Sequence, residues 1–194
     1  DSYNTAVGHG TGGAVTTGVE NTLIGAHSGD ALTTGGKNAV LGKGALGADT
    51  AGSLSVAVGY NALAAQNFST ATNTFNTAVG ENSGLAMTTG TENALFGGRS
   101  GLALTDADYN VAIGKGALQA DTLGSRTTAV GYQALATQNF TTATDTYNTA
   151  VGFGAGGAIT VGQLNTLIGA SAGVALIDGG RNTAVGYAAL STED

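Results

Sequence analysis

Two histidines, His9 and His27, are the residues of this 194-residue chain best suited to binding a metal ion or moving a proton. They occupy neighbouring turn positions in successive copies of a sequence repeat, and the chain has no cysteine to accompany them. A structural zinc site needs four protein ligands, and a catalytic one needs three. We therefore expect isolated surface histidines in preference to a metal site.

Two glycine-rich stretches match G-x-G-x-x-G, the pattern of loops that bind the pyrophosphate of a dinucleotide. They are Gly8–Gly13 and Gly152–Gly157, and each follows an expected strand. A dinucleotide site also requires that the loop opens a helix and that an acidic residue follows about 20 residues later. The sequence provides neither feature, so we interpret both stretches as turns and expect no cofactor.

Asp106 and Asp108 are the carboxylates closest to a calcium-binding arrangement, because hard cations prefer oxygen ligands. The glycine-rich nonapeptide of calcium-binding rolls is absent around them, which disfavours a metal site. An enzyme is expected to break its own repeat where its chemistry occurs. No combination of serine, histidine and aspartate stands outside the repeat here, so we expect no catalytic activity.

Asn67–Ser69 and Asn139–Thr141 match the acceptor pattern for N-glycosylation. A chain this rich in threonine and asparagine produces such matches by chance, and we favour chance as their source. If a host does modify them, the sugars would decorate two loops that interrupt the repeat.

All of these residues lie on one repeated frame, which begins with the phrase Asn-Thr-Ala-Val-Gly at Asn4–Gly8. The phrase occurs in eleven exact or conservative copies with a period of 17, interrupted by two spacings of 21, so that a super-repeat with a period of 72 results. The closing glycines are Gly8, Gly25, Gly42, Gly59, Gly80, Gly97, Gly114, Gly131, Gly152, Gly169 and Gly186. A short constant period is typical of solenoids, whose units bury their apolar faces only against neighbours.

The sequence therefore predicts an all-β fold, a parallel β-solenoid (β-roll) of about eleven coils of 17 or 21 residues. Residues 1–194 form a single repeat domain with super-repeats 4–75 and 76–147 and a partial one, 148–194. With 34 glycines, no tryptophan and no proline, the chain suits thin coils filled by alanine, valine, leucine and isoleucine.

We count positions in each coil from its closing glycine at 0. Position −1 is always large and apolar, as in Val7 and Phe96, and we expect it to point into the coil. Position −2, on the opposite face of the strand, is never polar, as in Ala6 and Leu23. A solvent-facing strand position is usually polar. We therefore expect position −2 to be buried against another chain.

Two further patterns concern the interior and the start of each phrase. Each complete coil carries one large apolar residue at either +4 or +7, as in Leu46 or Leu32, which suits close packing of a narrow interior. Asparagine opens nine of the eleven phrases, and Ser55 and Thr127 open the others. Asparagines stacked in register predict an amide ladder along the solenoid axis.

The two longer coils contain related inserts, at residues 66–75 and 138–147. An insertion that recurs at one place in a solenoid usually emerges on one face, often the binding face. With roughly 4.8 Å per coil, the two would lie about 19 Å apart. We expect the insert aromatics to be candidate surface contacts, with packing against the loop stem as the alternative for about half of them. They are Phe68, Phe75, Phe140 and Tyr147.

The overall charge of −7, without any basic cluster, argues against nucleic acid and anionic membranes as partners. The longest apolar runs contain only four to six residues, which is too short to span a membrane, so we expect no membrane insertion. Because residue 1 is Asp and not Met, we interpret the sequence as a processed product or a fragment.

The repeated phrase, together with Tyr-x-Ala-Leu at Tyr60–Leu63, Tyr132–Leu135 and Tyr187–Leu190, resembles the head repeats of trimeric autotransporter adhesins. It resembles related repeats in phage tail fibres and bacterial surface proteins more closely. The resemblance covers essentially the whole chain. It implies a left-handed parallel β-roll, three chains side by side, and a stiff extracellular, cell-surface or virion fibre that attaches to a surface carbohydrate or protein.

Three hypotheses about function follow. The first is a homotrimeric attachment fibre. The second is a filament or matrix protein that assembles end to end without a specific ligand; the chain ends are spaced so that a neighbour could almost continue the repeat. The third is an ice-binding solenoid, suggested by threonines such as Thr5 and Thr22 at position −3. Ala39, Val56, Ala94 and Val111 interrupt that rank, which disfavours it, and a thermal-hysteresis assay would decide the question.

Overall fold

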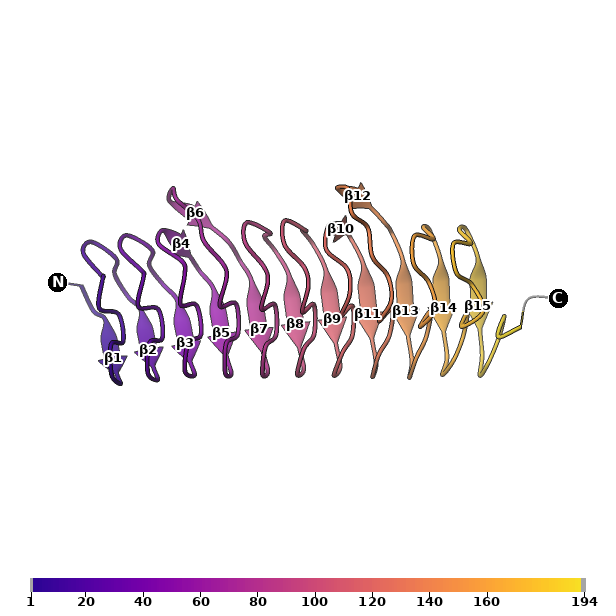
Figure 1. Ribbon diagram of the computed structural model, residues 1–194, viewed down its shortest axis with the longest axis horizontal. Helices are drawn as coiled ribbons and strands as arrows, with labels where there is room; N and C mark the ends of the chain where they lie inside the picture. The colour runs from indigo at the N-terminus through magenta and orange to yellow at the C-terminus, as the bar shows by residue number, and fades with distance from the viewer. Residues whose placement is uncertain (1, 193–194) are drawn as a thin grey trace.

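Each copy of the five-residue phrase forms one short β-strand, and the strands stack into a single parallel sheet (Figure 1). The computed structural model describes residues 2–192, and it contains no helix within that range. The eleven sheet strands, in spatial order, are β1 (Thr5–Val7), β2 (Thr22–Ile24), β3 (Ala39–Leu41), β5 (Val56–Val58), β7 (Thr77–Val79), β8 (Ala94–Phe96), β9 (Val111–Ile113), β11 (Thr128–Val130), β13 (Thr149–Val151), β14 (Thr166–Ile168) and β15 (Thr183–Val185). The predicted all-β parallel solenoid of about eleven coils is confirmed.

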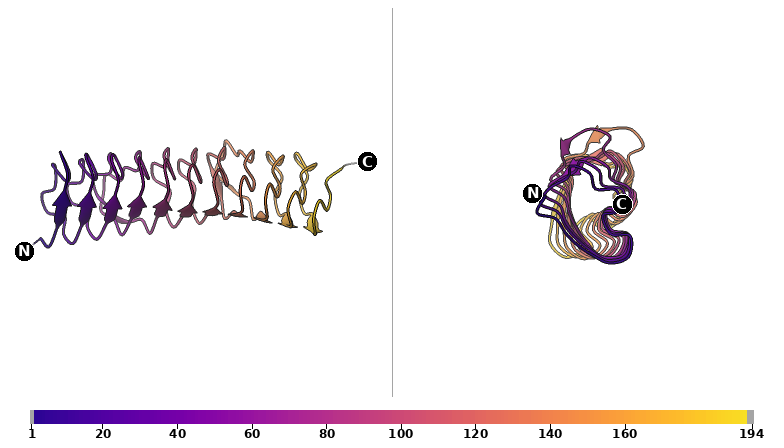
Figure 2. Two further views of the ribbon diagram at one scale, coloured as in Figure 1. Left: turned by 90° about the horizontal axis from the view of Figure 1, so that it is seen from below. Right: turned by 90° about the vertical axis from the view of Figure 1, so that its left-hand side faces the viewer.

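Neighbouring strands pair in register, so that equal repeat positions lie above one another. In β1 and β2, for example, Thr5 pairs with Thr22 and Val7 with Ile24. Backbone hydrogen bonds also join the turns, as between the His27 N–H and the His9 carbonyl at 2.9 Å. Viewed along the axis, the coils therefore superpose into one tube (Figure 2). Each repeat position becomes a rank of side chains along the whole length of the solenoid.

The strand faces are the reverse of the prediction. Position −2 fills the interior, where Leu23 is 1% exposed and Ala57 is fully buried. Position −1 points outward: Val7 is 58% exposed and Ile113 is 41% exposed. The expectations that −1 enters the coil and that −2 is covered by another chain are therefore both wrong. Alternation along a strand separates the two faces but does not say which one faces the interior.

The narrow interior explains this assignment. The predicted large residue at +4 or +7 is confirmed in the core, where Leu46, Leu63, Leu32 and Met87 are fully buried. Alanine at −2 leaves room for these side chains in most coils. Leucine at −2 occurs where +4 is glycine, and a Cβ added at Gly29 would lie 3.0 Å from the Leu23 side chain. If position −2 also held a β-branched residue in every coil, these side chains and the large residues at +4 or +7 would overfill the interior.

The corners of the coil depend on three ranks of residues in the left-handed region of φ. Every non-glycine residue with positive φ in the described chain lies at position +2, +4 or −5, as do Gln133 (φ 52°), Leu135 (φ 49°) and Arg126 (φ 60°). Such a conformation costs an L-residue about 1–2 kcal/mol. The buried leucines at +4 offset that cost by apolar burial.

The predicted asparagine ladder exists, but it joins side chains mainly to the backbone. The Asn21 carboxamide oxygen accepts the backbone N–H of Asn38 at 3.0 Å, one coil further on. The Asn21 Nδ2 group donates to the Gly35 carbonyl at 3.0 Å and so closes its own coil. Because these asparagines are buried, each satisfies two backbone groups that water cannot reach.

The two inserts leave this frame on the same side of the tube, as predicted (Figures 1 and 2). In the first, β6 (Thr72–Asn73) pairs in parallel with β4 (Gly52–Ser53) of the preceding coil. In the second, β12 (Thr144–Asp145) pairs in the same way with β10 (Gly124–Ser125). Each insert is therefore a short ribbon that rises from the solenoid at a fixed place in the super-repeat.

Candidate functional site

The outer face of the eleven-stranded sheet presents positions −3 and −1 to its surroundings. Position −1 provides only valine, isoleucine, leucine and phenylalanine, and Leu41, Phe96 and Ile168 are 40% to 48% exposed. Position −3 adds threonine, alanine and valine. Parallel sheets are normally covered on both faces. This sheet therefore has one face covered by its own coil and a second face, with an apolar rank at −1 beside a largely threonine rank at −3, that the described chain does not cover.

The four aromatic residues that were predicted as surface contacts fall into a buried pair and an exposed pair. Phe68 and Phe140 are only 8% and 5% exposed, so as surface contacts these two predictions are wrong. They closely follow the buried Gln66 and Gln138 side chains and belong to the stem of each insert. Phe75 and Tyr147 are 55% and 53% exposed and remain candidates for contact with a partner.

A buried polar network holds the base of the first insert. The Asp49 Oδ1 atom accepts the backbone N–H groups of Gly52 (3.0 Å) and Phe68 (3.1 Å). Its Oδ2 atom accepts Gln66 Nε2 at 2.6 Å, and Gln66 Oε1 accepts the Asn76 side chain at 2.9 Å. All three side chains are fully buried. Hydrogen bonds to a carboxylate are short and strong, so this network fixes where the insert leaves the coil.

The same network recurs one super-repeat later. Asp121 accepts the N–H groups of Gly124 (3.1 Å) and Phe140 (2.9 Å) and the Gln138 side chain (2.6 Å). Gln138 in turn accepts Asn148 Nδ2 at 2.8 Å. The two copies have closely similar hydrogen-bond lengths, and in both of them Asp and Gln at +7 hold the stem of the insert.

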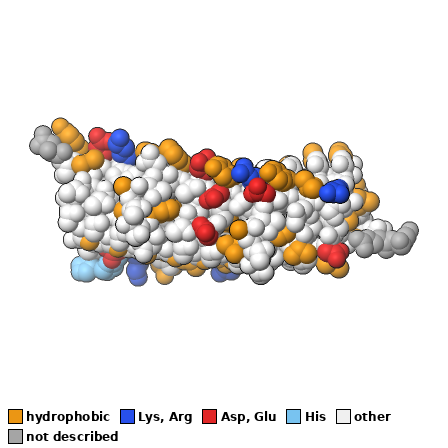
Figure 3. All heavy atoms as spheres, turned by 90° about the horizontal axis from the view of Figure 1, so that it is seen from above, with side chains coloured by type: hydrophobic (Ala, Val, Ile, Leu, Met, Phe, Trp, Pro, Cys, Tyr) orange, Lys and Arg blue, Asp and Glu red, His pale blue; other side chains and the backbone are white. Residues whose placement is uncertain are grey.

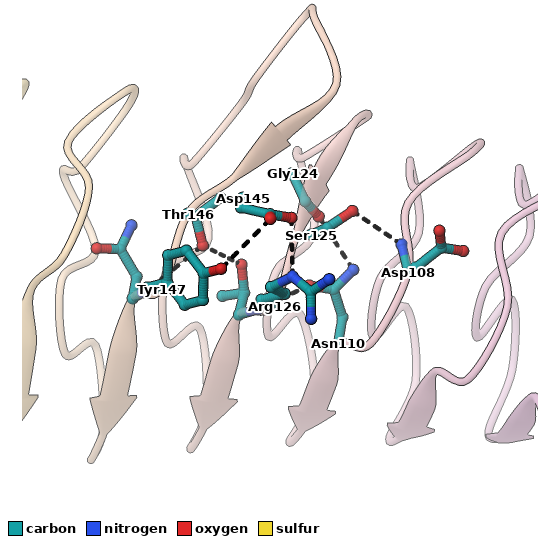
Figure 4. A network of polar contacts seen from close by, with 10 residues as sticks. Asp108, Asn110, Gly124, Ser125, Arg126, Asp145, Thr146 and Tyr147 are labelled. Carbon is teal, nitrogen blue, oxygen red and sulfur yellow. Dashed lines mark hydrogen bonds and ion pairs between the residues drawn. The ribbon is translucent and has the colours of Figure 1, made fainter.

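Beside the second insert lies a cluster of charged and aromatic side chains (Figure 4). Arg126 Nε lies 3.0 Å from Asp145 Oδ1 in β12, and its guanidinium lies 4.7 Å from the centre of the Tyr109 ring. Tyr147 donates from its hydroxyl to Asp145 Oδ2 at 3.4 Å. The hydrogen bond and the charge of Asp145 raise the pKa of Arg126 above its ordinary value. The cluster ties the insert to the two coils before it.

We expect Arg126→Ala to change stability little. Both partners of the ion pair are more than 40% exposed, and exposed pairs contribute little to stability because solvent and salt screen them. A thermal unfolding curve should therefore shift by no more than a few degrees. A loss comparable to that of a buried network residue would contradict the view that this cluster only fastens the insert.

The corresponding place beside the first insert is a cavity of about 250 Å³. We call it the first notch, and it lies between β4, β6 and the two preceding coils. Its lining includes Val19, Thr34, Lys37, Ser53, Leu54 and Asn73. The equivalents in the next super-repeat, which we call the second notch, are Thr91, Asp106, Tyr109, Ser125, Arg126 and Asp145. The same backbone motif therefore occurs twice with different side chains.

The histidines and aspartates singled out for metal chemistry each contact neighbouring residues of the solenoid. His9 and His27 contact each other edge to face with ring centres 5.3 Å apart, and His27 Nδ1 lies 3.2 Å from Asp30, so they are not isolated. Asp106 and Asp108 accept hydrogen bonds from Thr89 (2.7 Å) and Thr91 (2.7 Å) of the preceding coil. Within residues 2–192, no group of three or more potential metal ligands is present.

Both G-x-G-x-x-G stretches form turns, as predicted. Gly10 and Gly12, like Gly154 and Gly156, occupy the left-handed corners at +2 and +4. In the face drawn in Figure 3, the histidines lie at the N-terminal end of one long edge. Charged and apolar side chains gather along the opposite edge, and backbone atoms and other side chains make up most of the surface between the two edges, together with a few acidic side chains (Figure 3).

The first notch was not predicted from the sequence, although a comparison of the two super-repeats could have indicated it. Aligning the two super-repeats shows Leu54 in place of Arg126 and Asn73 in place of Asp145. Both partners of the ion pair in the second super-repeat are therefore replaced by uncharged residues in the first. Such a paired change indicates that the two positions are in contact, which the structure shows for Arg126 and Asp145.

No protein-family model, curated protein or solved structure matches the chain. None of the described residues forms a helix that could cross a membrane. The candidate surfaces are thus described from the structure alone. They are the outer face of the parallel sheet and the two inserts.

Proposed function

We propose that the chain is a structural segment of an extracellular or virion fibre with an attachment role and without catalytic activity. In this proposal three copies pack side by side through the outer faces of their sheets. The observation that carries it is the apolar rank at position −1, which is unbroken through eleven strands. The inserts, with Phe75 and Tyr147 exposed, then provide contacts to a surface carbohydrate or protein.

The extent of the apolar rank supports side-by-side packing. With roughly 4.8 Å between strands, eleven strands extend the rank over about 48 Å. Soluble monomers rarely expose contiguous apolar patches of more than a few hundred Å². Covering the outer face would give the sheet the two buried faces that parallel sheets normally have. The number three comes from the resemblance to adhesin and tail-fibre repeats.

The second candidate is a filament assembled end to end, in which the coils of one chain continue the repeat of the next without a specific ligand. Strand edges that pair with another chain are the general route to such growth.

The molar mass in solution, measured by light scattering over a hundredfold dilution, tests the proposal. A constant mass near three times 18.7 kDa would support the trimer. Ile113→Asp places a charge in the middle of the outer face, and we expect it to reduce the mass to that of one chain. Thr142→Asp, which adds the same charge on an exposed part of the second insert, should leave the mass unchanged.

Two outcomes would count against the trimer. A mass that rises steadily with concentration would favour the end-to-end filament. A stable monomer of the unmodified chain would mean that the outer face needs no cover, and the side-by-side proposal would fail.

A further inference from the structure

We infer that the first notch is a binding site for a single sugar residue that carries a carboxylate, an inference that rests on the attachment role proposed above. Two observations carry it. The first notch has polar groups available around an open cavity, and in its duplicate in the next super-repeat the side chains in place of Asn73, Thr34 and Gly36 are bonded to protein partners.

The side chains of the first notch leave their polar groups available. Ser53 Oγ accepts the Gly36 N–H at 3.0 Å, so its own proton is free to be donated. Thr34 and Asn73 are exposed, and neither side chain forms a hydrogen bond with the described chain. In the described chain, the Lys37 ammonium group has one ion-pair partner, Glu20 at 4.0 Å, and both side chains are more than half exposed. An exposed pair at that distance is weak and can yield to a stronger partner.

In the second notch, Ser125 accepts the Asp108 N–H at 3.0 Å in the same way as Ser53 accepts that of Gly36, but the groups at other equivalent positions are bonded to protein partners. Asp145, in place of Asn73, is bound to Arg126 at 3.0 Å. Asp108, in place of Gly36, accepts the Thr91 backbone and hydroxyl groups at 2.7 and 3.0 Å. The contrast shows that the backbone motif by itself does not require free donors. They result from the side chains that the first super-repeat has at these positions.

The two notches also differ in charge. Among the residues that line the first notch, Lys37 is the only ionisable one, so the lining itself has a charge of +1, with Glu20 outside the lining at 4.0 Å from the ammonium group. The equivalent positions of the second notch contain three carboxylates and the single cation of Arg126, and their net charge is therefore −2. In a protein with a net charge of −7, the first notch is a place where an anion meets a cation.

The size and composition of the cavity define the ligand further. A volume of about 250 Å³ is below the ~300–1,000 Å³ of sites for drug-sized ligands, and it suits one sugar ring. Val19 and Leu54 provide apolar surface for the C–H groups of the ring. Thr34, Ser53 and Asn73 can bond to its hydroxyl groups, and Lys37 can pair with a carboxylate.

The test is ligand-observed saturation-transfer NMR on the full chain with methyl β-glucuronide and methyl β-glucoside, which differ by one carboxylate. This measurement does not depend on whether the chain is a monomer or a trimer, so its outcome is separate from the mass measurement above. We expect binding of the glucuronide at millimolar concentration and at least tenfold weaker binding of the glucoside. Lys37→Gln should remove this preference.

A second variant tests the location. Leu54→Arg/Asn73→Asp transfers the ion pair of the second notch into the first, where Leu54 (φ 63°) and Arg126 (φ 60°) have the same backbone conformation. We expect this variant to fold normally and to lose glucuronide binding. Equal signals from both sugars, no signal from either, or a signal that persists in the double variant would overturn the inference.

Discussion

Gly97→Ala is expected to destabilise the protein by about 3–5 kcal/mol, which is at the upper end for a single substitution. Gly97 has φ +132°, a conformation that costs a residue with a side chain about 1–3 kcal/mol. An added Cβ would also lie 2.7 Å from the Gly114 carbonyl carbon and oxygen of the next coil. Because the coils are joined by backbone hydrogen bonds on every side, the next coil cannot move away without breaking them.

Gly186→Ala is the matched control, because it separates the close contact from the backbone conformation. Gly186 has nearly the same φ, +129°, but an added Cβ meets no atom within 4 Å. We expect it to cost about 1–3 kcal/mol, from conformation alone. Both variants should be compared by urea unfolding at one protein concentration, since assembly would shift the curves. Equal losses would show that close approach between coils is not the reason for glycine at this position.

Asp121→Ala is expected to have the second large effect, also about 3–5 kcal/mol. It would leave the N–H groups of Gly124 and Phe140 without an acceptor in a fully buried site and would remove one acceptor of the Gln138 amide. Each unsatisfied buried donor costs about 1–3 kcal/mol, and Gln138 retains a second acceptor in Thr127. The second insert should become mobile, which faster amide exchange at Phe140 would reveal.

The duplicate network and an exposed aspartate provide the controls. Asp49→Ala should cost the same as Asp121→Ala, because both carboxylates accept the same three hydrogen bonds at closely similar lengths. Asp106→Ala, which removes an exposed carboxylate bonded to Thr89, should change stability by no more than about 0.5 kcal/mol. A similar loss for Asp106 and Asp121 would contradict the structural role of the buried network.

The repeat pattern made some features of the fold predictable from the sequence. The invariant closing glycine and its regular spacing were sufficient to predict the solenoid, its parallel strands and the stacking of equal positions. The alternation between +4 and +7 predicted the core residues Leu46 and Leu32 correctly. Repetition makes such inferences strong, because each position is sampled eleven times under the same constraint.

The direction of the strand faces could not be predicted in the same way. Positions −1 and −2 are both apolar, so periodicity separated them without ranking them. The interior volume decided the outcome: leucine or methionine from +4 or +7 already fills it, and alanine is what fits at −2 in most coils. The larger residues at −1 were thereby placed outside, where they form the proposed interface.

The sequence by itself determined the number of coils, the register of the strands and the place of the two inserts, because these follow from spacing along the chain. Only the tertiary structure decided that Phe68 and Phe140 are buried while Phe75 and Tyr147 are exposed. Only the structure brought Arg126 to Asp145 and left a cavity beside Leu54 and Asn73. These contacts join residues from different coils, and their outcome depends on side-chain volume and on available hydrogen-bond partners, which spacing along the chain does not specify.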